Sequence, residues 1–140
     1  MDNLREILDQ ARSSIKRIQT LNSRIDFYRA AAERATSSYE AVRVSGTGGR
    51  SRVEDNAVKL MDVQSALADE LDRSKETLRQ AEYLVTRVYG KYYDVLNARY
   101  LERMSWADIA DKLKYDIRWV HRLHGYALLE LGKRVFEEQA

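Results

Sequence analysis

The 140-residue sequence contains no cysteine, no proline and only six glycines. Without cysteine the chain cannot form disulfide bonds or thiolate metal sites. Without proline it lacks the strongest helix breaker, so long helices are expected wherever apolar residues keep helical spacing. It also lacks an apolar run of the roughly 20 residues that a membrane span needs, and its charged N-terminus does not resemble a signal peptide. We therefore expect an all-α, soluble, cytoplasmic protein.

Charge is nearly balanced over the whole chain, with 24 basic and 22 acidic side chains and a net charge of +2. It is unevenly distributed, however. Residues 1–86 carry 14 basic and 14 acidic side chains, whereas residues 87–134 carry 10 basic and 6 acidic ones, a net charge of +4. The basic excess in the C-terminal part favours a partner rich in phosphate.

Two long segments show the alternating steps of four and three residues that are typical of a helix with one apolar face. The first predicts a helix over residues 1–44, and consecutive three-residue steps at Ile15, Ile18 and Leu21 leave open that Asn22 takes the seam position there. The apolar positions of this helix are Leu4, Leu8, Ala11, Ile15, Ile18, Leu21, Ile25, Tyr28, Ala32, Ala35 and Tyr39.

The second segment predicts a helix over residues 53–89. Its expected seam consists of Ala57, Met61, Gln64, Leu67, Leu71, Ser74, Leu78, Ala81, Val85, Val88, Tyr92 and Val95. The intervening residues 45–52, SGTGGRSR, predict a flexible connector, with an arginine-bearing loop that touches nucleic acid as the alternative. They lack the Gly-Lys-Ser/Thr ending of a phosphate-binding loop. Two helices joined in this way should fold into a long antiparallel hairpin.

The apolar faces of the predicted hairpin could be buried against each other or against a second chain. Because helix-turn-helix proteins often bind DNA as two-fold dimers, we expect a homodimer formed through the hairpin. Gly90 is expected to form a kink, after which residues 90–140 form a C-terminal domain.

The stretch Trp106 to Gly125 has the pattern of a helix-turn-helix, in which one helix supports a second that enters the DNA major groove. Ser105 and Asp116 are predicted to cap the two helices. Lys114 stands where such turns commonly have glycine, and it should adopt a left-handed conformation at a cost of about 1 kcal/mol. The predicted core of the motif consists of Ile109, Ala110, Leu113, Tyr115 (pointing inward from the turn), Val120 and Leu123.

With Val120 and Leu123 facing inward, the first turns of the second helix present a different set of side chains outward. Arginine there can bond a guanine edge or a phosphate. The predicted DNA-binding residues are Ile117, Arg118, His121 and Arg122, together with Lys114 and Ser105. A plain helical bundle explains the inward residues equally well, but it does not explain an outward face with no acidic residue.

The segment "VLNARYLERMSWADIADKLKYDIRWVHRLHGYALLEL" resembles the C-terminal block of phage late-transcription regulators of the ArpU/RinA type, which is itself similar to region 4 of sigma-70 factors. The pieces that carry the likeness are "LNARY", "SWADIADKL" and "VHRLHGYALLEL". This resemblance implies a phage or prophage activator of packaging and structural genes. Such a protein would act in the bacterial cytoplasm on promoter DNA, with host RNA polymerase as a further partner. Asp116, Ile117 and Trp119 depart from the family's commoner residues, so the DNA sequence bound should differ.

Enzymatic chemistry is not expected, because the chain has no cysteine nucleophile and no phosphate loop. His121 and His124 lie three residues apart on one helix, but no acidic residue completes a metal site on that face, so no metal or cofactor is expected. His124 is expected to pack beside the core or to contact phosphate. The alternative function is a coiled-coil structural or adaptor protein, or a small DNA-packaging subunit, that uses the helix-turn-helix for DNA or protein contact.

Overall fold

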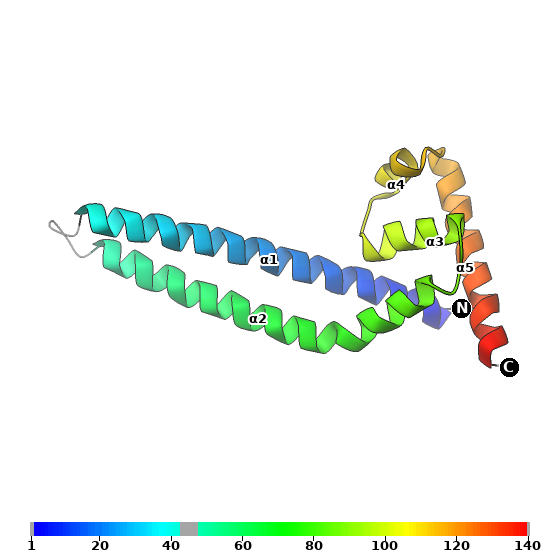
Figure 1. The fold of residues 1–140 in the computed structure, drawn as a ribbon, viewed down its shortest axis with the longest axis horizontal. Helices are drawn as coiled ribbons and strands as arrows, with labels where there is room; N and C mark the ends of the chain where they lie inside the picture. The colour runs from blue at the N-terminus through cyan, green and yellow to red at the C-terminus, as the bar shows by residue number, and fades with distance from the viewer. Residues whose placement is uncertain (1, 43–47, 140) are drawn as a thin grey trace. The chain divides into compact units, whose positions relative to one another are not determined.

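The computed structural model describes residues 2–42 and 48–139, and in these ranges it contains helices and no strand. The prediction of an all-α chain with a long helical hairpin is confirmed (Figure 1). The elements are α1 (Asp2–Val42), α2 (Gly48–Val85), α3 (Lys91–Leu96), the π-helix η1 (Asn97–Leu101), α4 (Trp106–Leu113) and α5 (Ile117–Gln139). None of the helices in the described ranges is apolar enough over its length to cross a bilayer.

The helix boundaries differ from the predicted ones at the connector. Helix α2 begins at Gly48 rather than at residue 53, so the prediction of a flexible segment is wrong for residues 48–52. Residues 45–47 lie outside the described ones. The glycines occupy only the first two positions of α2, where helix propensity matters least, and Arg50, Ser51 and Arg52 have ordinary propensities. The second helix also ends early, at Val85, and the turn that follows runs to Gly90.

Gly90 ends this turn and is not a kink in a continuous helix. Its φ of 60° and ψ of −131° belong to a backbone region that is essentially restricted to glycine. The chain can therefore reverse into α3 within a few residues.

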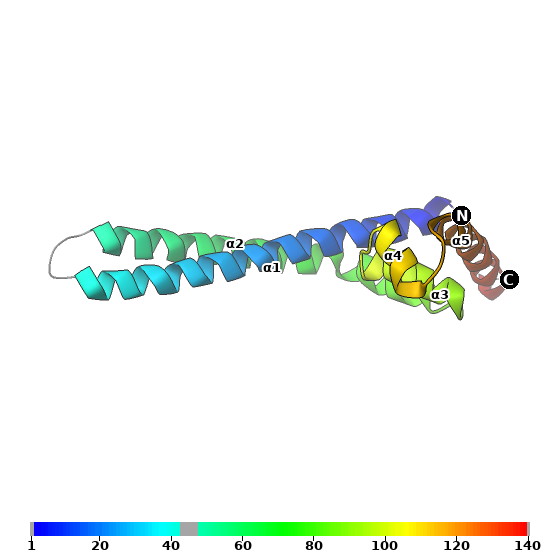
Figure 2. The ribbon, with the colours of Figure 1, turned by 90° about the horizontal axis from the view of Figure 1, so that it is seen from above.

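The chain divides into two compact units, and their boundaries cut across both long helices. The C-terminal unit contains Met1–Lys16 and Ser74–Ala140, and the arm unit contains Arg17–Arg73. The expected domain boundary near residue 90 therefore differs from the structural one, because the ends of α1 and α2 pack with the C-terminal helices. Within each unit, α1 and α2 lie side by side and antiparallel (Figures 1 and 2).

The seam of α1 follows the predicted spacing over the described side chains. Leu8, Ala11, Ile25 and Ala35 are buried, and the positions between them are half-buried. Asn22 is exposed, so the seam runs through Leu21 and the alternative through Asn22 is wrong. The side chain of Tyr39 lies outside the described residues.

The predicted seam of the second helix is confirmed in its C-terminal part and displaced in its N-terminal part. Its members Leu67, Ser74, Leu78, Ala81, Val85, Val88, Tyr92 and Val95 are buried or half-buried. Ala57, Met61, Gln64 and Leu71 are exposed. The buried or half-buried positions of α2 are Val53, Asn56, Leu60, Val63, Leu67, Glu70, Ser74, Thr77, Leu78, Gln80, Ala81, Leu84 and Val85. From Val53 to Thr77 these positions alternate in steps of three and four residues. The N-terminal part of α2 thus carries two overlapping heptad patterns, one through Met61 and one through Leu60. Helix α1 covers only the pattern through Leu60.

A buried carboxylate helps fix this register in the arm unit. Glu70 is 2% exposed, its Oε1 accepts a hydrogen bond from Nε of Arg17 at 2.9 Å, and its Oε2 accepts one from Nη2 of Arg73 at 2.8 Å. The hydrogen bond from Arg73 is the largest influence that holds the pKa of Glu70 below its usual value, with Arg17 adding to it. Farther along the arm, Lys59 lies over the ring of Tyr28 at 6.0 Å. Both pairs belong to one antiparallel register, because Tyr28 lies as many residues after Arg17 in α1 as Lys59 lies before Glu70 in α2.

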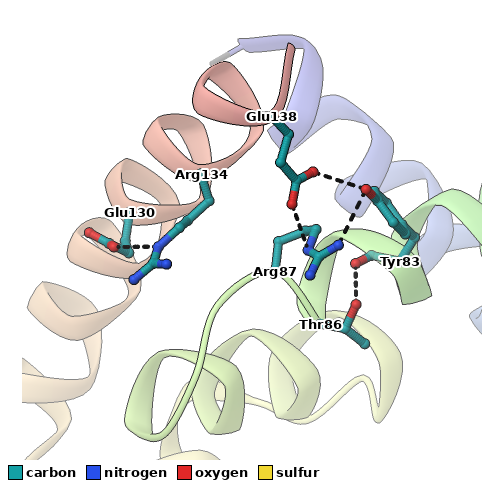
Figure 3. Close-up of polar contacts among 6 residues, drawn as sticks. All are labelled: Tyr83, Thr86, Arg87, Glu130, Arg134 and Glu138. Atoms are coloured by element: carbon teal, nitrogen blue, oxygen red, sulfur yellow. Dashed lines mark hydrogen bonds and ion pairs between the residues drawn. The ribbon is translucent and has the colours of Figure 1, made fainter. Parts of the chain in front are cut away.

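The larger core lies in the C-terminal unit, where α5 packs on α3, η1 and the ends of α1 and α2. Its fully or nearly fully buried members are Leu8, Ala11, Ala81, Leu84, Val85, Val88, Leu96, Tyr100, Ala127 and Leu131. Polar contacts join the end of α5 to the end of α2 (Figure 3). Glu138 accepts a hydrogen bond from the hydroxyl group of Tyr83 at 2.9 Å, and it pairs with Nε of Arg87 at 3.2 Å. The position of α5 is therefore fixed along its length.

Candidate nucleic-acid interface

Helix α4 is capped at both ends by the residues that the sequence indicated. The hydroxyl oxygen of Ser105 accepts a hydrogen bond from the backbone N–H of Asp108 at 3.1 Å. Lys114 has φ 60° and ψ 41°, the left-handed conformation expected at the turn. The N–H of Tyr115 then donates to the carbonyl oxygen of Ala110 at 3.0 Å, which closes the helix in a Schellman-type arrangement.

Helix α5 starts directly after the turn and is capped by Asp116. Oδ1 of Asp116 accepts a hydrogen bond from the backbone N–H of Arg118 at 2.8 Å. The turn is therefore only three residues long, and α4 and α5 are held together as a tight pair, seen in Figure 1 between the labels of α4 and α5. Because both ends are fixed by hydrogen bonds, the first turn of α5 is presented in one orientation.

A small core holds the two helices together. Ile109 and Val120 are fully buried with Ala98, and Met104, Trp106, Ala110 and Leu113 pack against them. Leu123 is also fully buried. Tyr115 is the exception, because it does not point into this core and 37% of its surface is exposed. The backbone N–H of Tyr115 closes α4 by its hydrogen bond to Ala110, while the side chain stays partly exposed.

The outward face of α5 carries the predicted DNA-binding side chains. Arg118, His121 and Arg122 are exposed, and Ile117 is 43% exposed. Among the described residues, neither Arg118 nor Arg122 has a carboxylate within 4 Å, so both guanidinium groups are available to a ligand. Lys114 and Ser105 are also exposed, at the two ends of α4. The structure thus places all six predicted residues on α4, α5 or the turn between them.

Trp106 contacts side chains of both α5 and η1 next to this face, a role that the sequence analysis did not assign. Its ring lies 4.5 Å from that of His121 and 4.8 Å from that of His124, measured between centroids. The guanidinium of Arg99 lies 4.2 Å from the centroid of the Trp106 ring, within cation–π range. His121 is therefore exposed but rests against a fixed aromatic surface. Only the position of a tryptophan in the first turn of α4 could have suggested this contact.

Arg99 comes from the π-helical segment η1, which also shapes the approach to α4. Nη1 of Arg99 donates to the carbonyl oxygen of Met104 at 3.1 Å, and Nε of Arg12 donates to the carbonyl oxygen of Arg99 at 3.1 Å. The intervening Arg103 has a positive φ of 57°. Short π-helical segments are frequent at functional sites because they re-aim side chains. Here the segment directs Arg99 to Trp106 while Tyr100 stays in the core.

His124 is a core residue and does not face the outward surface. It is 7% exposed, and Nε2 lies 2.7 Å from the hydroxyl group of Tyr100. Burial is the main cause that lowers the pKa of His124 to about 4, with repulsion from Arg5 and Arg99 adding to it. The ring is therefore neutral near pH 7. No group of three or more His, Cys, Asp or Glu side chains that could hold a metal ion occurs among the described residues.

A second set of aromatic and basic side chains adjoins the outward face. Nζ of Lys91 lies 5.7 Å from the ring centroid of Trp119, and the Trp119 ring lies 6.2 Å from that of Tyr126. Lys91 is exposed at the start of α3. The sequence analysis missed this lysine because it is 28 residues from Trp119, and only the packing of α3 on α5 brings them together.

Comparisons of the chain with family models, with curated proteins and with solved structures found no match. What the protein does must therefore be inferred from its own residues and geometry.

Proposed function

We propose that this protein is a sequence-specific transcriptional regulator that binds double-stranded DNA through the first turns of α5. The observation that carries the proposal is the division of α5 into two faces. Val120 and Leu123 are fully buried, while Arg118, His121 and Arg122 are exposed on the other side of the same turns. A recognition helix needs this arrangement, because it must be anchored on one face and present hydrogen-bond donors to the major groove on the other.

The proposed contacts assign different tasks to the predicted residues. Arg118, nearest the helix start, bonds a base edge, and Arg122, one turn later, bonds a base or a phosphate. Lys114 and Ser105 lie at the ends of α4, the helix that crosses the phosphate backbone in such motifs. Lys91 beside Trp119 extends the basic surface along the flank of α5. The net charge of +4 over residues 87–134 supports the same partner.

The proposed biological role is activation of late genes for packaging and structural proteins in a phage or prophage. The support is the resemblance of residues 95–131 to regulators of the ArpU/RinA type. In that role the protein would act in the bacterial cytoplasm at promoter DNA and contact host RNA polymerase. Trp106, Ile109 and the capped turn give the resembling segment the local structure that such a motif requires.

A second candidate is a structural, adaptor or packaging protein that uses α5 for protein contact. Tyr126, Leu129 and Phe136 on α5 are 48%, 51% and 72% exposed, which favours an apolar partner for the later part of this helix. Salt dependence distinguishes the two functions. DNA affinity falls steeply as salt rises because counterions are released, whereas an apolar protein contact is much less sensitive.

The experiment begins with genome-wide mapping of binding sites in the host cell, followed by fluorescence anisotropy on a mapped site and on a random duplex. The double substitution Arg118→Ala with Arg122→Ala should weaken binding to both duplexes and reduce the discrimination between them. Lys133→Ala, an exposed lysine farther along α5, is the matched control and should keep it. Unchanged affinity of the double variant for both duplexes, with the fold intact by circular dichroism, would refute the assignment. A reporter driven by the mapped promoter then tests activation.

A further inference from the structure

Helix α2 carries an apolar stripe that the chain itself does not cover. Ala57, Met61, Gln64, Ala68 and Leu71 follow one another at steps of four, three, four and three residues, and all are exposed. Met61 is 68% exposed and Leu71 46%, and the adjacent Val58 is 57% exposed. We call these six residues the outer stripe. Its spacing is that of a helix-packing seam, and the small alanine side chains in it permit close approach of another helix.

The outer stripe is distinct from the seam that packs on α1. The inner seam uses Leu60, Val63, Leu67 and Glu70, whose positions are set by the contacts of Glu70 with Arg17 and of Lys59 with Tyr28. A one-residue shift around the helix separates Met61 from Leu60 and Leu71 from Glu70. Because α1 is already engaged with the inner seam, it cannot also cover the outer stripe.

The arm unit buries little apolar surface by itself. Among its described side chains, Ile25 and Ala35 are the buried apolar residues, and the third buried residue is the charged Glu70. A pair of helices with so small a core gains little hydrophobic free energy to offset the entropy lost on ordering. Small units of this kind are commonly completed by association with a further chain.

Charge indicates which kind of helix fits the outer stripe. In α2, residues 53–73 contain six acidic and two basic side chains, a net charge of −4. In α1, residues 17–35 contain four basic and two acidic ones, a net charge of +2, and Arg24, Arg29 and Arg34 are exposed. Asp62, Asp69 and Asp72 are exposed on α2. A second α2 would bring acidic residues together, whereas a basic amphipathic helix such as α1 would pair opposite charges.

We propose that the outer stripe of α2 docks α1 of a second copy of this chain. Two arm units then form a four-helix bundle in which each α1 has an α2 on either side, one from its own chain and one from the other copy. Because the dimer has a two-fold axis, the contact between α2 of one copy and α1 of the other occurs twice. The proposal concerns the arm unit and is independent of DNA binding, because its tests contain no DNA.

The first test measures association of the full-length protein by sedimentation equilibrium over a range of concentrations. The wild type should be a dimer at micromolar concentration. Met61→Glu and Leu71→Glu each place a carboxylate in the contact, and each should raise the dimer dissociation constant at least about 100-fold. Both side chains are exposed in the single chain, so helicity by circular dichroism should not change.

The matched control is Ala66→Glu, which adds the same charge at an exposed position of α2 outside the outer stripe. It should leave the dissociation constant within about two-fold of the wild type, since surface substitutions away from a contact have small effects. A wild type that remains monomeric at high micromolar concentration overturns the proposal. So does a dimer that Met61→Glu and Leu71→Glu weaken no more than Ala66→Glu does.

The second test identifies the helix that lies on the stripe, and it exploits the absence of cysteine from the chain. Met61→Cys protein is mixed with Arg24→Cys, Arg29→Cys or Arg34→Cys protein and treated with a short thiol cross-linker. Cross-links between the two different variants in at least one mixture support the α2-to-α1 contact. Cross-links confined to pairs of Met61→Cys chains show that two α2 helices face each other, and they overturn it.

Discussion

The hydroxyl group of Tyr100 lies 2.7 Å from Nε2 of His124, and both side chains are buried in the C-terminal unit. Burial raises the pKa of Tyr100 and lowers that of His124, so both groups are neutral near pH 7. The pair joins η1 to α5 directly behind Trp106, which contacts the rings of both histidines. Protonation of His124 would place a charge in this packed region without an acidic partner among its recorded contacts.

Stability should therefore fall as the pH is lowered from about 6.5 to about 4. The pKa of His124 in the folded protein is about 4, below the ordinary value of 6.5, so the unfolded chain binds more protons in this window. The full effect is about 3 kcal/mol, reached below pH 4. Urea unfolding of the wild type at pH 7 and pH 4.5 measures it.

Two variants separate this effect from general acid sensitivity. His124→Gln removes the titrating group, so the difference in unfolding free energy between pH 7 and pH 4.5 should become smaller. His121→Gln removes the exposed histidine and should keep the wild-type difference. An unchanged pH dependence in His124→Gln would show that other groups cause the loss.

Lys114→Gly should raise stability and weaken DNA binding at the same time. Lys114 has a left-handed backbone, which glycine adopts at no steric cost, so the free energy of unfolding should increase by about 1 kcal/mol. The proposed phosphate contact is lost with the side chain, so the salt dependence of DNA affinity should decrease by about one unit of slope. Thermal unfolding and anisotropy at several salt concentrations measure the two effects.

Lys114→Ala provides the comparison for this prediction. It removes the same amine but keeps the left-handed strain, so affinity should fall as in Lys114→Gly while stability stays near that of the wild type. Equal DNA affinity in the wild type and both variants would exclude Lys114 from the interface.

Ala110→Leu should destabilise the helix-turn-helix. Ala110 packs against the core of Ile109, Val120 and Ala98, where a larger side chain forces α4 away from α5. The expected cost is about 1–3 kcal/mol of unfolding free energy, measured by urea titration. Ala107→Leu makes the same change at an exposed position of α4 and should cost less than about 0.5 kcal/mol. Similar costs for both variants would show that α4 does not rest on α5 through Ala110.

The features that could be predicted from the sequence are those set by local backbone chemistry. Ser105 determines where α4 begins, Lys114 where it ends and Asp116 where α5 begins. They do so through local backbone conformation and hydrogen bonds within a few residues, which leave a clear mark in the sequence. The seam of α1 could also be predicted, because it contains one apolar pattern.

The features that could not be predicted depend on contacts between distant segments. Helix α2 contains two apolar patterns of equal regularity, and the choice of Leu60 over Met61 is made by Arg17 and Glu70, 53 residues apart. The contacts of Trp106 with Arg99 and with the two histidines likewise depend on the π-helical turn at Asn97–Leu101. The prediction for Tyr115 was wrong because the general pattern of such turns places an apolar side chain in the core at this position, whereas the tyrosine side chain here stays 37% exposed.

Arg118 and Arg122 should have separable effects on DNA binding, although they lie one turn apart on the same face of α5. Arg118 is in the first turn, beside the capped N-terminus, where recognition helices contact base edges. Arg118→Ala should therefore cost about 1–3 kcal/mol on the mapped site, cost less on random DNA, and relax the preference at one base pair.

Arg122 lies one turn farther along the helix, so in the proposed complex we expect it to bond a phosphate. Arg122→Ala should then weaken mapped and random duplexes by the same factor and lower the salt slope by about one. Anisotropy titrations of both variants on both duplexes at several salt concentrations measure the four affinities and their salt dependence. If Arg122→Ala instead relaxes preference at a single base pair and leaves the salt slope unchanged, Arg122 contacts a base, and the groove must extend over two turns of α5.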